Sequence, residues 1–194
     1  GDQFQVPWLI TGVVLMVVVG AVILGGIQRI AATASAVVPA MAIAYVIMSL
    51  NVIALHIDQV PAAIATIVDS AFNGAAATGG FAGATVWAAI RFGVARGIFS
   101  NEAGLGSAPI SHAAARTNQP VEQGLVAMLG TFIDTLVVCT MTGLVIMLTG
   151  VLDSGISGAS LTASAFGASI PGGELVVTIG VVLFATTTMI GWSF

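Results

Sequence analysis

The feature that most constrains this chain is the length of its apolar runs, several of which extend for about twenty residues or more with hardly any charge. Hydrophobic residues make up 58% of the 194 positions and charged residues only 6%. A soluble domain carries about 25% charged residues, and this chain lacks the charges that would cover a water-exposed surface. Runs of this length suit helices that cross a bilayer. The sequence therefore predicts an all-α, polytopic membrane protein and excludes a soluble globular one.

The apolar runs predict five membrane spans within a single transmembrane domain, 1–194. They cover about 8–26, 30–57, 79–115, 120–149 and 174–194. Pro39 predicts a kink in the second span, because proline removes a backbone donor. The third span is rich in glycine and contains two arginines and Pro109, so we expect it to be broken. A loop rich in glycine, serine and alanine is expected at 153–173.

The segment 61–73 differs in kind from the spans. Helical spacing places its apolar residues on one face and its polar residues on the other: Ile64, Ile67, Val68, Ala71 and Phe72 against Thr66, Asp69, Ser70 and Asn73. This spacing predicts a short amphipathic helix that lies in the membrane interface. Pro61 suits its first helical position.

Both ends of the sequence indicate a longer chain. The first residues are polar, with no basic segment and no initiator methionine, so we expect no signal peptide. The last residues, up to Phe194, lie inside an apolar run. We therefore expect this sequence to be part of a larger membrane protein.

The few basic and nucleophilic residues exclude several function classes. The basic residues are four arginines without a cluster, so no nucleic-acid partner is expected. Cys139 is the single cysteine, and with His56 and His112 it forms no zinc spacing. No nucleophile–base pair or metal triad suggests an intramembrane enzyme, so we do not expect an enzyme.

The strongest functional signal is the run from Arg96 to Pro109, which places polar residues and glycines inside a membrane span. Such a stretch is tolerated only where it faces protein or a hydrated cavity. In secondary transporters a broken helix of this kind binds substrate and ions. The predicted substrate-binding residues are Phe99, Ser100, Asn101, Gly104, Gly106 and Ser107. The spacing of Gly79 with Gly83, and of Gly93 with Gly97, favours close helix packing instead.

Four charged residues lie well inside the expected spans, away from the span ends. They are Arg91, Arg96, Glu102 and Asp134. Such residues are costly in a bilayer, so they line an internal path or form ion pairs, and the sequence leaves both interpretations open. Asp134 also shares a helical stripe with three threonines of the fourth span: Thr131, Thr135 and Thr142. That stripe borders a pathway or bonds to a neighbouring helix.

The fifth span carries three consecutive threonines, Thr186 to Thr188, in an apolar background. Hydroxyl and carbonyl oxygens suit a hard cation such as sodium. The alternative is that each hydroxyl bonds to a carbonyl of its own helix one turn back.

One long motif resembles a known family. The segment from Gly93 to Ala115, with Arg96-Gly97-Ile98-Phe99-Ser100-Asn101-Glu102-Ala103-Gly104 at its centre, closely resembles the alanine or glycine:cation symporter family, the sodium:alanine symporters. Shorter matches occur at 25–30, 38–42, 123–128, 132–136 and 188–192. The resemblance covers nearly the whole chain.

The resemblance implies a leucine-transporter-like fold with inverted repeats, and uptake of alanine or glycine coupled to sodium. It places the third span as the sixth core helix, broken at 100–107, and the fifth span as the eighth. Thr186 and Thr187 would then help to hold sodium, the coupling ion, with no other cofactor. The loop at 153–173 would cap the substrate. A multi-pass protein of the cell inner (plasma) membrane is implied.

The resemblance also implies what is missing. The family's first broken helix, with its Gly-Thr-Gly-Asn motif, and its last two core helices have no counterpart here. Transport would therefore require the remainder of the chain.

The alternative functions are an ion channel or another cation-coupled solute carrier. A channel usually repeats one selectivity loop around a pore, whereas the polar positions here are scattered over three spans, which favours an enclosed site.

Overall fold

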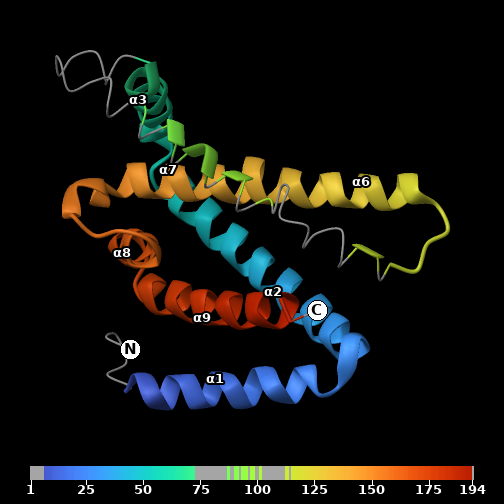
Figure 1. The fold of residues 1–194 in the computed structure, drawn as a ribbon. Helices are drawn as coiled ribbons and strands as arrows, with labels where there is room; N and C mark the ends of the chain where they lie inside the picture. Colours follow the sequence, from blue (N-terminus) through green and yellow to red (C-terminus); the bar gives the residue numbers. More distant parts are fainter. Residues whose placement is uncertain are drawn as a thin grey trace. The chain divides into compact units, whose positions relative to one another are not determined.

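The computed structural model describes residues 7–72, 87, 90–91, 93–95, 97–98, 101, 112–113 and 115–193. Within this part of the chain the regular structure is entirely helical (Figure 1). The chain divides into two compact units, one made of Gly1–Tyr45 with Val176–Phe194, the other of Val46–Leu175. The expected all-helical membrane architecture is confirmed, whereas the inverted-repeat fold stays a prediction.

The first unit begins with α1 (Trp8–Ile23) and a tight turn into α2 (Gly26–Leu55). The sequence placed residues 27–29 between two spans, but α2 already includes them. Gly26 makes this possible because its φ of 74° is a left-handed conformation that favours glycine. The Arg29 guanidinium then reaches back and donates to the Ala21 carbonyl at 3.4 Å, which covers the end of α1.

Helix α2 continues without a break through Pro39 for 30 residues. Its second half belongs to the second unit, where Ser49 and Val52 are fully buried. A short 3₁₀ turn, η1 (Ile57–Gln59), follows and leads directly into α3 (Val60–Phe72). Pro61 lies in the first turn of α3, where its missing N–H leaves no helical hydrogen bond unmade.

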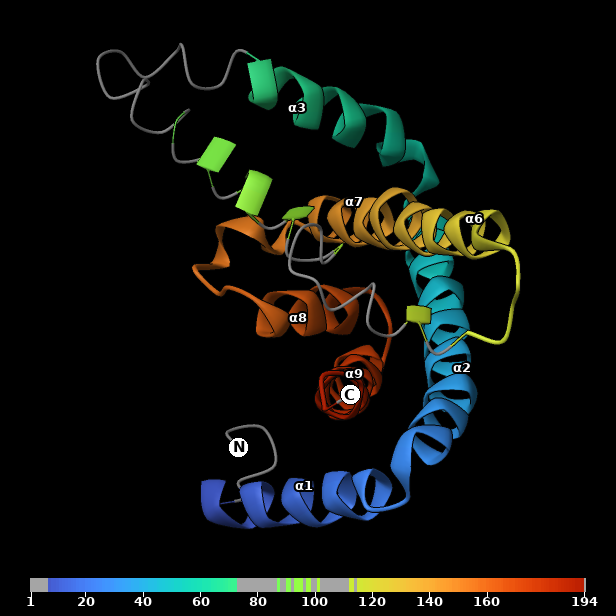
Figure 2. The same cartoon turned by 45° about the vertical axis from the view of Figure 1, so that its right-hand side comes forward.

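Helix α3 lies against α7 (Thr140–Thr149), as Figure 2 shows. Its face toward the protein contains Ala63, which is buried. The wide apolar face expected from the sequence is turned outward, with Ile64 48% and Val68 51% exposed. An outward apolar face is consistent with an interfacial helix, because that face can enter the acyl boundary.

The longest continuous helix of the second unit occupies the expected range 120–149. It consists of α6 (Pro120–Thr131), the π-helical segment η2 (Phe132–Cys139) and α7. Figure 1 shows α6 and α7 as one straight rod. The change to π-helical geometry in the middle was not predicted, because the expected stripe assumed a regular α-helical repeat.

The expected loop at 153–173 is wrong, because the structure places a helix in it. After the 3₁₀ turn η3 (Val151–Ser154), helix α8 (Ala159–Ser169) contacts α7 (Figure 2). Phe166 of α8 is fully buried, as is Val145 of α7. The small residues of α8 are good or tolerable helix formers, and burial of Phe166 fixes the helix on its neighbour. The sequence reasoning treated glycine and serine content as loop signals and missed this packing.

Helix α8 turns sharply into α9 (Gly173–Gly191). Gly173 is required at this corner, since a Cβ atom there would meet the Phe166 carbonyl oxygen at 2.5 Å. Helix α9 is apolar over most of its length and carries the three threonines near its end.

Three helices of the described chain are long and apolar enough to cross a membrane. They are Gln28–Leu55, Pro120–Thr149 and Gly173–Gly191. Their surfaces are largely apolar and exposed, for example Val121 at 74% and Phe184 at 60%. Apolar patches of this kind are unfavourable in water and natural in lipid. Helix α1 is shorter and much of the third expected span is outside the described residues, so the count of five spans stays a prediction.

Candidate functional site

The predicted site residues fall into two groups. Those outside the described residues are Phe99, Ser100, Gly104, Gly106, Ser107, Arg96 and Glu102. The structure describes Asn101, Arg91, Asp134, Thr186 and Thr187. Of these, Arg91 is exposed, whereas Asn101 and Asp134 are half-buried.

Asn101 is the described residue of the predicted substrate site, and its amide group makes bonds at both ends. Its backbone N–H donates to the Gly97 carbonyl at 3.2 Å, and its side-chain Nδ2 donates to the same oxygen at 3.0 Å. Its Oδ1 accepts a hydrogen bond of 3.0 Å from the Thr135 hydroxyl, 34 positions further along the chain. The structure therefore brings together one predicted site residue and one residue of the predicted polar stripe.

Thr135 belongs to η2, so π-helical geometry interrupts the regular α-helical repeat on which the predicted stripe was based. A π-helix forms i→i+5 hydrogen bonds, so each of its turns contains about one residue more than an α-helical turn. Side chains on the two sides of η2 consequently point in directions that an α-helical repeat does not give. Thr131 and Thr142 donate to carbonyls of their own helix, those of Ala127 and Val138. Thr135, in the middle of the stripe, donates to another segment.

Asp134 immediately precedes Thr135 in η2, so a carboxylate lies next to the hydroxyl that holds Asn101. An ionisable group at this depth is costly in a bilayer, and π-helical turns in helices are frequent at functional sites. The arrangement places a carboxylate, a hydroxyl and a carboxamide within one short stretch of the fold. Oxygen-rich groups of this kind can interact with a cation or with the polar ends of an amino acid.

Thr186 and Thr187 bond within α9, as the second interpretation of the sequence expects. The Thr186 hydroxyl donates to the Val182 carbonyl at 2.7 Å, and the Thr187 hydroxyl lies 3.0 Å from the carbonyls of both Leu183 and Phe184. A hydroxyl that donates its proton keeps its oxygen lone pairs, so these bonds are compatible with cation binding. The role of the two threonines in holding sodium stays a prediction.

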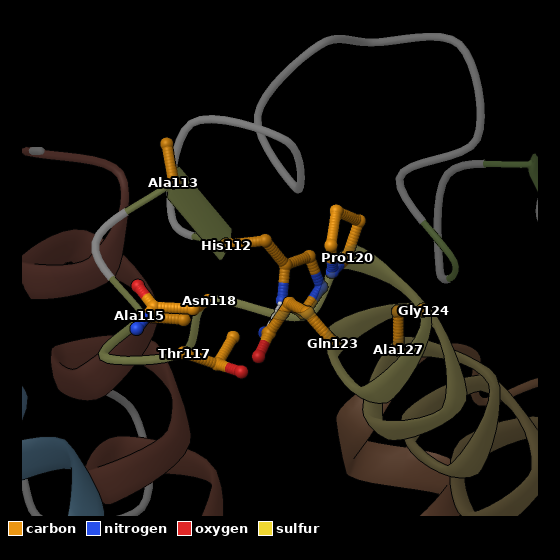
Figure 3. Close-up of a pocket in the computed structure, with 9 residues that line it drawn as sticks. All are labelled: His112, Ala113, Ala115, Thr117, Asn118, Pro120, Gln123, Gly124 and Ala127. Carbon is orange, nitrogen blue, oxygen red and sulfur yellow. Dashed lines mark hydrogen bonds between the residues drawn. The ribbon is translucent and has the colours of Figure 1, made fainter.

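A hollow at the start of α6 was not singled out from the sequence. Figure 3 shows its lining, in which the side chains of His112 and Gln123 lie next to each other. Its volume is about 400 Å³, and the His112 Nδ1 and Gln123 Nε2 atoms are 2.6 Å apart. The first turn of α6 is held by a second pair, because the Thr117 hydroxyl donates to the Glu122 carboxylate at 3.0 Å. These contacts tie the segment before α6 to its first turns.

The hollow and the Asn101 contact differ in what they offer. The hollow is wide, and its walls include alanines and a glycine as well as His112 and Gln123. The Asn101 contact joins two expected spans through hydrogen-bonding groups. Among the described residues, no three His, Cys, Asp or Glu side chains come together as a metal centre would require.

Comparison with known proteins places the chain in a defined group. The sequence model of the family described as "Sodium:alanine symporter family" matches residues 1–194. An "Uncharacterized transporter" of Haemophilus influenzae is 53% identical over 198 residues, covering 100% of this chain and 43% of the relative. "Sodium/alanine symporter AgcS" of Methanococcus maripaludis is 51% identical, with 100% of this chain and 43% of the relative covered.

A more distant relative has a different substrate in its name. "Probable sodium/glutamine symporter GlnT" of Bacillus subtilis is 40% identical, covering 98% of this chain and 39% of the relative. The chain thus spans about two fifths of the length of the curated relatives that it matches.

Proposed function

The chain belongs to the sodium:alanine symporter family, and on that premise we propose that the complete protein is a secondary active transporter that takes up a small neutral amino acid together with sodium. Alanine or glycine is the proposed substrate, and sodium is the coupling ion. The proposed location is the cell inner (plasma) membrane, which the three long apolar helices support. Transport is assigned to the complete protein, because this chain spans only part of its relatives.

The observation that carries the proposal is the family match over all 194 residues. It is supported by a relative whose name states sodium and alanine and which is 51% identical along the whole chain. An enzyme is disfavoured, because the family is one of transporters. Glutamine is the alternative substrate. One observation favours it, namely the relative named as a probable sodium/glutamine symporter.

The described geometry supports an enclosed site rather than an open pore. The Asn101 carboxamide and the Thr135 hydroxyl come from two different expected spans and lie in direct contact, 3.0 Å apart. A polar contact that joins two spans supports a site enclosed between helices, the arrangement in which secondary transporters bind substrate. Asn101 is also held from within its own segment, since its backbone N–H and Nδ2 both bind the Gly97 carbonyl.

The proposed sodium ligands are the hydroxyl oxygens of Thr186 and Thr187. Each hydroxyl proton is directed to a carbonyl of α9, so the oxygen lone pairs are directed away from that bond. Two adjacent oxygens in an apolar helix suit a hard monovalent cation that is selected by geometry rather than by charge. The remaining ligands would come from parts of the complete protein that this chain does not contain.

The test is uptake of labelled alanine by the purified complete protein in proteoliposomes. We expect uptake to require an inward sodium gradient, to stop when potassium replaces sodium, and to collapse when an ionophore dissipates the gradient. Competition with unlabelled glycine and with unlabelled glutamine distinguishes the two substrate proposals. Sodium flux that does not depend on any amino acid would instead support an ion channel and contradict the proposal.

A further inference from the structure

Both ends of the Asn101 carboxamide make hydrogen bonds. Two donors of Asn101 converge on one oxygen, the Gly97 carbonyl, at 3.2 Å and 3.0 Å. Its own oxygen, Oδ1, accepts a hydrogen bond of 3.0 Å from the Thr135 hydroxyl. Gly97 is close in sequence and belongs to the same segment, whereas Thr135 belongs to another expected span. Thr135 is therefore the external contact that the structure gives to this side chain.

These contacts select one orientation of the amide. If the side chain were rotated by half a turn, Oδ1 would face the Gly97 carbonyl and two acceptors would oppose each other. In the observed orientation Nδ2 faces the acceptor and Oδ1 faces a hydroxyl that can donate. The hydrogen-bond network is thus consistent with one placement of the amide oxygen and nitrogen. The Gly97 carbonyl, which can only accept, selects this orientation, and the Thr135 hydroxyl satisfies Oδ1 in it.

Thr135 differs from other threonines of the same long helix in the acceptor that it uses. A hydroxyl has one proton to donate, and Thr149 donates it to the Val145 carbonyl of its own helix at 2.9 Å. The Thr135 proton is given to Asn101 instead, from within the π-helical segment η2. The bond to Asn101 is therefore made at the expense of the usual bond to the helix's own backbone.

We propose that Thr135 is a positioning residue, which acts through its hydrogen bond to fix the direction of the Asn101 carboxamide at the substrate site. This rests on the proposed function, in which Asn101 contacts the amino-acid substrate. An amide nitrogen has two N–H groups, and Gly97 uses one, so the second can donate to the carboxylate of an amino acid. A fixed amide offers that N–H in one direction. Without Thr135 the amide keeps only its bond to the Gly97 carbonyl and is less restricted, so binding has to restrict it further.

The test compares Thr135→Val with Thr135→Ser in the complete protein. Valine keeps the shape of threonine and removes the donor, whereas serine keeps the donor. Hydrogen bonds between membrane helices affect equilibria by roughly three- to fifteenfold. We expect Thr135→Val to raise the KM for alanine by about that factor while the maximal rate changes by less than about twofold. Thr135→Ser should restore a KM close to that of the wild type.

The matched control is Thr149→Val, which removes a hydroxyl that bonds within the same long helix. It should leave the KM for alanine unchanged. A second readout is the unfolding midpoint of Thr135→Val, Asn101→Ala and the double variant in detergent. If the two side chains are in contact, the effects are not additive, because the second substitution removes a bond that is already lost.

The outcomes separate this inference from the proposed function. If the wild-type protein shows no sodium-dependent alanine uptake, the proposed function fails and this inference fails with it. If the wild type transports but Thr135→Val keeps the wild-type KM, the inference alone is overturned. It is also overturned if serine fails to restore the KM, since the effect would then come from shape. Additive unfolding midpoints would show that the contact itself is absent.

Discussion

Two long helices of this chain carry threonines within apolar surroundings, and these threonines make different kinds of hydrogen bonds in the two helices. In α9 the hydroxyls of Thr186 and Thr187 donate to carbonyls of α9 itself, and the helix remains α-helical from Gly173 to Gly191. In the long helix from Pro120 to Thr149, the polar middle is π-helical, and Thr135 donates to Asn101 of another segment.

The difference shows how backbone geometry affects the bonds that a half-buried threonine hydroxyl makes. A regular α-helix presents a carbonyl one turn back, within reach of every threonine hydroxyl. The wider π-helical turn changes that relation and accompanies a hydroxyl that reaches outside its own helix. Thr186 and Thr187 thus donate their protons within α9, which leaves their oxygen lone pairs available. Thr135 donates its proton to a side chain of another segment.

The largest effect is expected from removing one residue in each helix. Deleting Ile133 from η2 should convert its wide π-helical turn into an α-helical turn. The buried face of α7 should then keep its register, whereas Asp134 and Thr135 should turn by about 100° relative to α6. We expect folded protein with background uptake. Deleting Leu183 from α9, which has no wide turn to close, should displace the buried Ile190.

Size-exclusion profiles in detergent and alanine uptake measure the two outcomes. The Leu183 deletion should lower the yield of monodisperse protein, whereas the Ile133 deletion should not. Equal yields from the two deletions would contradict the distinction between the helices.

A smaller effect is expected from Thr186→Val and Thr187→Val in the complete protein. Loss of one oxygen that contacts a cation is worth roughly 1.5–3 kcal/mol, or about ten- to a hundredfold in sodium affinity. At least one variant should need that much more sodium for half-maximal uptake, and the KM for alanine should recover at saturating sodium. Valine preserves the β-branched shape, so α9 should remain intact.

Uptake at varied sodium concentration provides the measurement, with Thr149→Val as the matched control because its hydroxyl also bonds within its own helix. Unchanged sodium dependence in both α9 variants would assign the sodium site elsewhere. The two threonines would then serve only their own helix.

A more modest difference between η2 and α9 is expected in the hydrogen-exchange rates of their backbone amides. The π-helical turn has poorer hydrogen-bond geometry than an α-helical one, so the amides of Phe132–Cys139 should open more readily than those in the middle of α9. We expect exchange that is roughly three- to tenfold faster in η2, a factor that corresponds to about one weak hydrogen bond. Hydrogen–deuterium exchange in nanodiscs measures it. Slower exchange in η2 than in α9 would show that the wide turn is not a weak point.

The smallest effect is expected for Thr149→Val. Its hydroxyl bonds to the Val145 carbonyl, which already belongs to the helix, so its removal leaves no partner in another segment unsatisfied. The free energy of unfolding should change by less than about 0.5 kcal/mol, and uptake should not change. A thermal unfolding series in detergent measures this. A large loss would mean that hydroxyls bonded within a helix also contribute to the fold.

The long helices were accessible from the sequence because length and lack of charge are sufficient to identify a helix that can cross lipid. The residues of α6, η2 and α7 together occupy the expected range 120–149. Helix α8 was missed because its sequence, rich in Ala, Ser and Gly, has no apolar period, and its position depends on the burial of Phe166 beside α7. A local pattern cannot report such a contact.

The site was accessible only in part. The run that contains Asn101 and the stripe that contains Thr135 were both identified as polar within spans. Their meeting was not, since 34 positions separate them and the π-helical turn has no sequence signature. The own-helix bonds of Thr186 and Thr187 matched one of the two interpretations that the residues allowed.

The corner between α7 and α8 has a consequence for biogenesis. The buried residues of this hairpin, Val145 and Phe166 among them, lie close together along the chain and are joined by the short turn η3. Closing so short a connection costs little chain entropy. The hairpin can therefore assemble soon after it leaves the ribosome, before later segments have emerged. It would then give the membrane-insertion machinery a pre-packed unit rather than two separate helices.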